Sequence, residues 1–239
     1  MLLLRIAPIF ACITGISTIL ITRLVSYLTA PQLFEHTIPT ISKTAAFEPA
    51  YYVFVVGMTI CAMMCPIVWT MMLLAHKRYF SLLTSQRNMI ISLLMCASLA
   101  GIFSGICLVT LTHITLEESD PTHIALSYSF FIFQLLAFLL DALGVSMMKK
   151  QLNVTSNHPL NMDLNYRRLL AYTLPIIGVI FYFLYVAKDT NWFEDKMLVQ
   201  ALYVSTEYII CISFFIYSGL LQRYIYAQYS VQQINNAIE

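Results

Sequence analysis

Residues 122–150 of the 239-residue chain read THIALSYSFFIFQLLAFLLDALGVSMMKK. The stretch holds a single acidic residue, Asp141, and it ends at the basic pair Lys149 and Lys150. An α-helix needs about 20 mostly apolar residues to cross roughly 30 Å of hydrocarbon. This segment therefore predicts a transmembrane helix over residues 122–148.

Five other stretches have the same character. They are continuous apolar runs, unlike the alternating segments of about ten residues that form membrane β-barrels. Because backbone groups in lipid must be satisfied internally, helices are the remaining solution. The sequence predicts an all-α, polytopic membrane protein with one six-helix domain over residues 1–222 and a short tail at 223–239. The five further spans are residues 6–28, 50–75, 89–112, 169–187 and 199–222.

The overall composition agrees with a chain that lies in a bilayer. Hydrophobic residues make up 59% of it and charged residues only 10%, whereas a soluble domain carries about 25% charged residues. This excludes a soluble globular enzyme. A net charge of +1, with no basic face, gives no basis for nucleic-acid binding. The expected partners are membrane lipids and unidentified membrane proteins, with no nucleic acid and no cofactor.

The orientation follows from the lysines and arginines at the span ends. Short cytosolic loops are enriched in these residues. The rule therefore predicts that both termini, and the tail at residues 223–239, are cytosolic. The side expected to be cytosolic holds Arg5, Lys77, Arg78, Arg87, Lys149, Lys150, Arg167, Arg168 and Arg223, and the other side holds Lys43, Lys188 and Lys196.

Three ionisable residues lie inside the predicted spans: Arg23, Asp141 and Glu207. A charge at mid-bilayer costs about 2.5–3.5 kcal/mol even on the most lenient scale. Arg23 is near the outer end of its span, so we expect its side chain to extend to the headgroups. Asp141 and Glu207 are each about 12 Å from the nearer boundary at 1.5 Å per residue. We expect both to face the bundle interior or a wet cavity, where they could relay protons or ions, bind a lipid headgroup, or hold helices together.

Catalytic and metal-binding motifs are missing from the sequence. It contains no HExxH, GxSxG or CxxC motif and no glycine-rich phosphate loop. His36, His113 and His123 lie near acids in the outer loops, but without the fixed spacing of a zinc site. We therefore predict no catalytic residue and no metal site. Pro66 and Pro175 interrupt two spans, which leaves a transporter open, although the two halves show no internal repeat.

Two short stretches resemble a known family. Residues 38–45 read IPTISKTA and are followed by Pro49 and Phe54, and Glu207-Tyr208 is followed by Phe214, Phe215 and Tyr217. This pattern is similar to the six-span family of damage-regulated autophagy modulators (DRAM). Its relatives include plasma-membrane phosphoinositide regulators and GPI-anchor lipid-remodelling factors. Lys43, Ala45 and Ala50 stand where the family usually has Asp, Gly and Glu, which indicates a divergent member.

The resemblance implies a multi-pass endomembrane protein, most often lysosomal, that modulates autophagy. The alternatives are a GPI-anchor or phosphoinositide lipid-remodelling factor in the ER, Golgi or plasma membrane, and a proton- or ion-coupled transporter. Pro39 fixes its own φ, and Ser42 and Thr44 can bond their own backbone. We therefore expect an ordered loop over the outer mouth of the bundle, with Glu207 beneath it. The candidate lipid- or ligand-binding residues are Glu207, Tyr208, Pro39, Ser42, Thr44 and Asp141.

Overall fold

The computed structural model describes residues 2–35, 37–114, 119–153, 163–188, 190 and 192–238. Within these ranges every regular element is a helix and there is no strand, which confirms the all-α prediction. Six of the helices are long and apolar enough to cross a membrane, which confirms the six predicted spans. The elements are α1 (Leu2–Thr29), η1 (Pro31–Phe34), α2 (Ile41–Thr44), α3 (Ala50–Lys77), η2 (Phe80–Leu82), α4 (Arg87–Thr112), α5 (Asp120–Leu152), α6 (Leu164–Lys188) and α7 (Lys196–Ile238).

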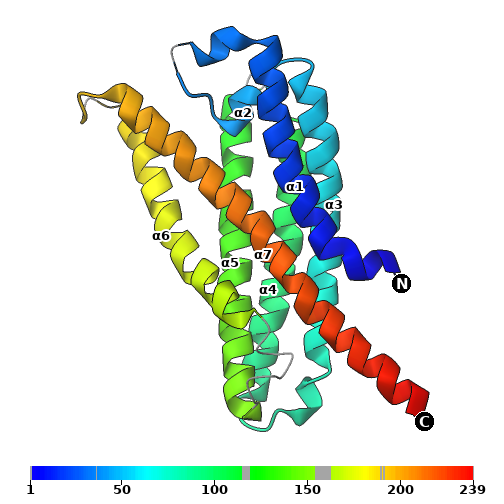
Figure 1. Ribbon diagram of the computed structural model, residues 1–239. Helices are drawn as coiled ribbons and strands as arrows, with labels where there is room; N and C mark the ends of the chain where they lie inside the picture. The colour runs from blue at the N-terminus through cyan, green and yellow to red at the C-terminus, as the bar shows by residue number, and fades with distance from the viewer. Residues whose placement is uncertain are drawn as a thin grey trace.

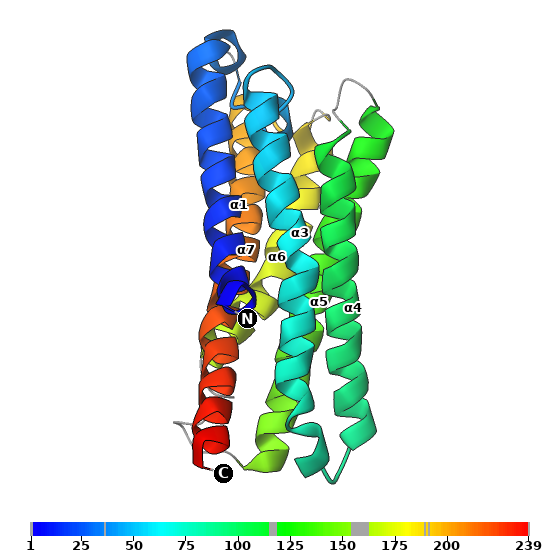
Figure 2. The ribbon, with the colours of Figure 1, turned by 90° about the vertical axis from the view of Figure 1, so that its right-hand side faces the viewer.

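The six long helices form a closed bundle in chain order (Figures 1 and 2). Each packs on the next, from α1 through α3, α4, α5 and α6 to α7, and α7 closes the ring against α1. In Figure 1, α6 and α7 are tilted against the nearly upright α4 and α5. We call the end that carries α2 the cap end and the end that carries Lys149 and Lys150 the basic end.

Prolines and turn residues set several helix ends. Pro31 follows the end of α1 after one residue, Ala30, and Pro49 is the N-cap of α3. Proline also opens α5, where its missing N–H would have no helical partner in any case. Asn153 ends the same helix in a left-handed conformation with φ 49°, which asparagine tolerates better than most residues.

The main differences from the predicted spans concern two boundaries and two prolines. Helix α6 begins at Leu164, five residues before the predicted start of its span, and so includes Arg167. Helix α7 continues to Ile238, so the backbone of the predicted tail extends the last span. Pro66 and Pro175 lie within continuous helices and do not break them, since neighbouring helices in a membrane bundle can compensate the lost hydrogen bond.

Small residues let the helices approach closely, as is usual in membrane bundles. A Cβ atom on Gly101 of α4 would lie 2.1 Å from the indole nitrogen of Trp69 on α3. A Cβ atom on Gly57 of α3 would lie 2.0 Å from the hydroxyl of Thr18 on α1. The interior is otherwise rich in aromatic rings, such as Phe138 and Tyr217, which stack with centroids 3.7 Å apart.

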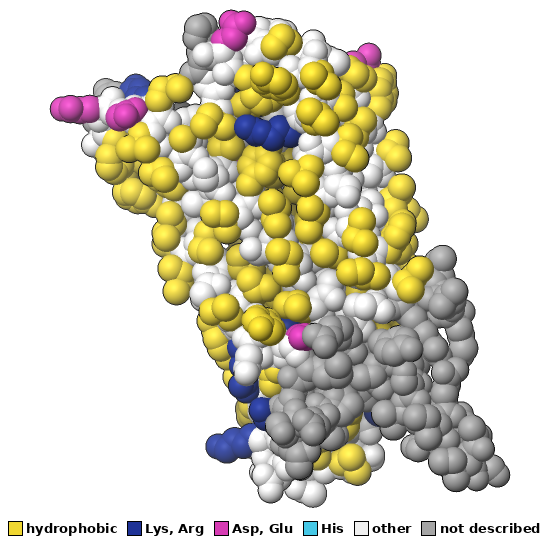
Figure 3. All heavy atoms as spheres, viewed as in Figure 1, with side chains coloured by type: hydrophobic (Ala, Val, Ile, Leu, Met, Phe, Trp, Pro, Cys, Tyr) yellow, Lys and Arg dark blue, Asp and Glu magenta, His cyan; other side chains and the backbone are white. Residues whose placement is uncertain are grey.

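The surface separates charge along the bundle axis. On the face drawn in Figure 3, Asp and Glu gather mostly at the cap end and Lys and Arg mostly at the opposite end. A broad hydrophobic band lies between them, as the bilayer interior requires. This arrangement is the one expected from the sequence, where the basic residues set the predicted orientation.

Candidate functional site

The segment over the cap end is ordered by its own side chains. We call residues 37–49 the cap segment. The Thr40 side chain is the N-cap of α2 and accepts a hydrogen bond from the Lys43 N–H at 3.2 Å. The Thr44 hydroxyl donates to the Ile41 carbonyl at 2.7 Å, as the sequence predicted for this residue. Ala45 has φ −88°, so the backbone here has no need of the family's glycine.

Glu207 lies beneath the cap segment and fastens it to α7. Its Oε2 accepts a hydrogen bond from the Ile41 backbone N–H at 3.0 Å. The side chain is only 8% exposed, which agrees with the expectation that it faces inward. Lys188 and Arg23 are the cations that act on this buried carboxylate electrostatically.

Arg23, which was expected to extend to the headgroups, is half-buried and contacts the cap segment and α7. Its Nη1 donates to the Tyr208 hydroxyl at 2.8 Å and to the Pro39 carbonyl at 3.3 Å. The guanidinium also lies over the Tyr208 ring at 5.1 Å and the Phe34 ring at 5.4 Å. Arg23 therefore ties α1 to α7 and to the cap segment, because partners inside the protein are available to it at that depth.

A cavity of about 340 Å³ lies below the cap segment, between the long helices. We call it the cap cavity. Its polar lining lies toward the cap end, and its deeper lining is mostly aromatic and aliphatic. The polar and charged lining residues include Ser42, Lys43, Asp120, His123, Lys188 and Glu207. The apolar ones include Phe54, Met58, Phe130, Phe131, Phe181 and Phe215.

A second, apolar hollow of about 500 Å³ lies between α5 and α6. We call it the α5/α6 crevice. It shares Tyr128, Phe131 and Phe181 with the cap cavity, so these three side chains separate the two spaces. The outer wall includes Ile132 and Val179, which are mostly exposed on the bundle surface. The crevice therefore adjoins the bilayer on one side and the cap cavity on the other.

The two spaces lie at different depths along the bundle axis, and their lining becomes less polar with depth, as a bilayer does. On α6, Lys188 marks the cap end, and Tyr182 and Pro175 lie about 9 and 20 Å below it at 1.5 Å per residue. Lys43 and Lys188 thus lie nearest to headgroup level, Glu207 lies deeper, and the crevice lies at the level of the hydrocarbon, which is roughly 30 Å thick. The site is shaped for a molecule with one polar and one apolar part.

Ser42 and His123 lie within the lining of the cap cavity. The Ser42 hydroxyl is 2.9 Å from His123 Nε2, although the sequence suggested that this hydroxyl would bond its own backbone. His123 Nδ1 is 2.6 Å from the Ile114 carbonyl oxygen. His123 is only 7% exposed.

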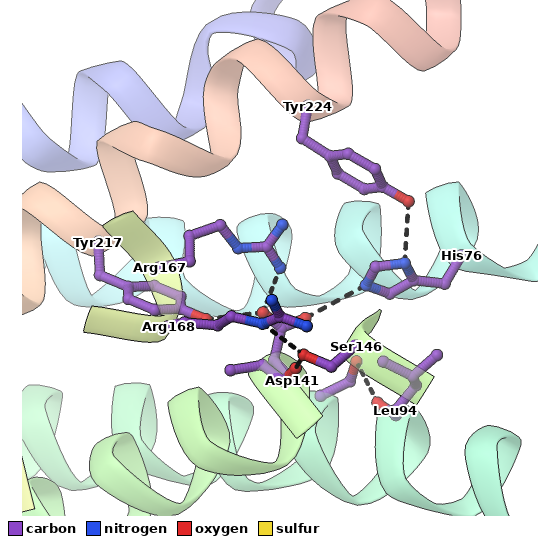
Figure 4. Close-up of polar contacts among 10 residues, drawn as sticks. His76, Leu94, Asp141, Ser146, Arg167, Arg168, Tyr217 and Tyr224 are labelled. Atoms are coloured by element: carbon purple, nitrogen blue, oxygen red, sulfur yellow. Dashed lines mark hydrogen bonds and ion pairs between the residues drawn. The ribbon is translucent and has the colours of Figure 1, made fainter. Parts of the chain in front are cut away.

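Asp141 belongs to a separate network at the basic end (Figure 4). Its Oδ2 forms an ion pair with Arg167 and accepts a hydrogen bond from the Tyr217 hydroxyl at 2.7 Å. Its Oδ1 lies 3.2 Å from His76 Nε2, and His76 Nδ1 is 2.9 Å from the Tyr224 hydroxyl. The network thus joins α3, α5, α6 and α7.

The basic-end network is sealed from solvent. Arg167 is 0% and Asp141 1% exposed, and neither lines the cap cavity or the crevice. Asp141 therefore faces the interior as predicted, but it is apart from Glu207.

His76 and Arg167 are two further ionisable residues inside the spans, and neither was predicted to lie there. Arg167 could have been found, because it falls on the buried stripe of Leu164, Ala171 and Leu174.

The structure brings five of the six candidate residues together. Pro39, Ser42, Thr44, Glu207 and Tyr208 all lie at the cap end, through the contacts given above, and Asp141 lies in the other network. Among the described residues, no group of three or more His, Cys, Asp or Glu side chains is placed to hold a metal ion.

These features define a multi-span membrane protein with a capped cavity that is partly polar and partly apolar. A family model described as the Frag1/DRAM/Sfk1/Cwh43P N-terminal domain matches residues 3–224. The chain belongs to this family, which confirms the resemblance found in the cap segment and the last span. No curated protein and no solved structure matches the chain.

Proposed function

We propose that this protein binds a membrane lipid in the cap cavity and thereby modulates the lipid state of an endomembrane. The observation that carries the proposal is the buried carboxylate of Glu207, which lines the cavity and whose Oε2 accepts a hydrogen bond from the Ile41 N–H. A buried carboxylate is costly unless it is paired or hydrogen-bonded. A headgroup that donates hydrogen bonds, such as an amine or a polyol, would supply a further partner in the cavity.

The other walls of the cavity support the same occupant. Lys43 and Lys188 line it at headgroup level, where cations can attract a phosphate group. The α5/α6 crevice below offers an apolar space beside the bilayer for an acyl chain. Ligand sites are commonly concave and mostly apolar, with a few polar groups that fix orientation, and the cap cavity has this character.

Lysosomal membranes and a role in autophagy are part of the proposal, and family membership supports them. Asp141 gives no support to an ion-coupled transporter, because it is paired with Arg167 away from both cavities. Tagged protein should co-localise with lysosomal markers, and its loss should alter autophagic flux. Confinement to the ER or Golgi would instead favour a lipid-remodelling factor of the secretory pathway.

The binding proposal is tested by the lipids that copurify with the full chain. The protein is extracted in mild detergent, delipidated stepwise, and its retained lipids are identified by mass spectrometry. The Glu207→Gln variant keeps a hydrogen-bond acceptor for Ile41 but removes the charge, so we expect its retained headgroup classes to change. Glu48→Gln is the matched control, because Glu48 is exposed and lies outside the cavity. Identical lipid profiles for wild type and Glu207→Gln would contradict the proposal.

A further inference from the structure

The contact between Ser42 and His123 joins elements that are far apart in the sequence. Ser42 is on α2 in the cap segment, and His123 is in the first turns of α5, which begins beside α2 at the cap end in Figure 1. The Oγ–Nε2 distance of 2.9 Å is a normal hydrogen bond. Both side chains line the cap cavity, so a bound lipid can reach them.

The proton positions in this pair follow from a third atom. The Ile114 carbonyl oxygen, 2.6 Å from His123 Nδ1, can only accept a hydrogen bond. Nδ1 must therefore carry the hydrogen, and in the neutral ring Nε2 is left with a free lone pair. The Ser42 hydroxyl then donates to Nε2. A hydroxyl bonded to a basic nitrogen, whose ring is oriented by a further acceptor, is the arrangement of an activated nucleophile and its base.

The position of the pair along the bundle suits the ester groups of a lipid. His123 is near the start of α5, and Tyr128, which borders the α5/α6 crevice, is five residues further on, or about 8 Å at 1.5 Å per residue. In a phospholipid, the ester carbonyls lie between the headgroup and the acyl chains. A lipid held with its phosphate near Lys43 and Lys188 and a chain toward the crevice would present an ester near this level.

We propose that Ser42 is the nucleophile and His123 the general base of an acyl-transfer reaction on an ester-linked membrane lipid held in the cap cavity. The inference rests on the proposed lipid binding and adds a chemical step to it. Holding α2 in place does not require the pair, because Glu207 already fixes the Ile41 N–H and Thr40 caps the helix.

The reaction balances without a cofactor. Ser42 Oγ forms a bond to the ester carbonyl carbon, and its proton moves to His123 Nε2. The ester C–O bond then breaks, and the alcohol oxygen of the deacylated lipid takes that proton. Water, or the hydroxyl of a second lipid, attacks the acyl-serine in the reverse manner. The products are a lysolipid and either a free fatty acid or a newly acylated lipid.

The test uses the full-length protein in phosphatidylcholine nanodiscs and a small alkyl fluorophosphonate, which forms a covalent bond with activated serines. Mass spectrometry of peptides should find the label on Ser42. His123→Gln should lower the labelling rate by at least about 100-fold, the lower range of general-base contributions. Ser127 lines the same cavity on α5 and should stay largely unlabelled. Ser205→Ala is the matched control variant, because Ser205 is exposed on α7 and lies outside the cavity, and it should leave Ser42 labelling unchanged. Each variant is first checked for an unchanged melting temperature in detergent.

A second measurement follows turnover. Vesicles of phosphatidylcholine, phosphatidylethanolamine and phosphatidylinositol with isotope-labelled acyl chains are incubated with the protein, and lysolipids are quantified. We expect lysolipid formation that Ser42→Ala abolishes. If folded wild-type protein retains lipid but shows neither Ser42 labelling nor Ser42-dependent lysolipid, acyl transfer is wrong and the binding proposal stands. If wild-type protein retains no lipid, the binding proposal itself fails. Equal labelling of Ser42 and Ser127 would also overturn the inference.

Discussion

Replacing Asp141 by asparagine removes the carboxylate that forms an ion pair with Arg167. If the contacts from Arg167, His76 and Tyr217 to Asp141 acted only as interhelical hydrogen bonds, each would contribute about 0.6 kcal/mol, and the three together about 2 kcal/mol. The geometry predicts a larger effect, because Arg167 is 0% exposed and would be left as a buried charge without a counter-ion. Removing one partner of a buried pair costs about 3–5 kcal/mol.

We therefore expect Asp141→Asn to lower the free energy of unfolding by about 3–5 kcal/mol. Because both groups are buried, solvent screening does not reduce this figure as it would for a surface pair. Arg167→Met should cost less, since Asp141 keeps its bonds to His76 and Tyr217. In the double variant neither charge remains, so its loss should be smaller than the sum of the two single losses by about 0.5–3 kcal/mol.

Equilibrium unfolding in mixed micelles of dodecylmaltoside and SDS measures these free energies. Arg168→Met is the matched control, since Arg168 is the next residue on α6 but is only half-buried and bonds the Ser146 hydroxyl at 2.7 Å. We expect it to cost no more than about 1 kcal/mol. Losses near 2 kcal/mol for Asp141→Asn, with additive behaviour in the double variant, would refute the charged pair and leave only a set of hydrogen bonds.

Three further predictions concern the cap segment, the helix packing and the orientation. Arg23→Met removes the bonds to Tyr208 and to the cap segment, so amide hydrogen exchange in residues 37–46 should accelerate; unchanged exchange would show that Arg23 does not order this segment. Gly101→Ala should destabilise by about 1–3 kcal/mol through overpacking against Trp69, whereas Gly178→Ala should be tolerated, because its Cβ would lie 3.5 Å from the nearest side-chain atom; equal melting temperatures would contradict this. If both termini are cytosolic, epitope tags at either terminus should become accessible to antibody when the plasma membrane alone is permeabilised and organelle membranes stay intact; tags that require permeabilised organelle membranes would contradict the orientation.

The six spans could be predicted from the sequence because the bilayer imposes a single requirement on every helix. Each span needs about 20 apolar residues, and each segment can be tested for this without knowledge of the others. The start of α6 was placed five residues too late because the adjacent Arg167 and Arg168 were assigned to a loop. Both belong to the helix, and Arg167 turns inward on the stripe that contains Leu164 and Ala171.

The candidate site was only partly predictable, because its contacts join distant segments. The family resemblance includes residues of the cap segment and Glu207, and this placed Glu207 beneath the segment. The hydrogen bond from the Ile41 N–H to Glu207 agrees with that placement. Ser42 and His123 are 81 residues apart and follow no motif spacing. Their contact exists because α2 packs at the end of the bundle where α5 begins. The sequence shows that a span contains a polar residue, but helix packing determines which residue becomes its partner.

The two polar clusters differ in a way that separates stability from function. At the basic end, Arg167 and Asp141 neutralise each other, and neither borders the cap cavity or the crevice. At the cap end, Glu207 and the Ser42–His123 pair border the cap cavity. Buried groups that only hold helices together need no open space, whereas a ligand site does. Substitutions at the basic end should therefore lower stability without changing which lipids are retained. Substitutions at the cap end should change the retained lipids at a smaller cost in stability.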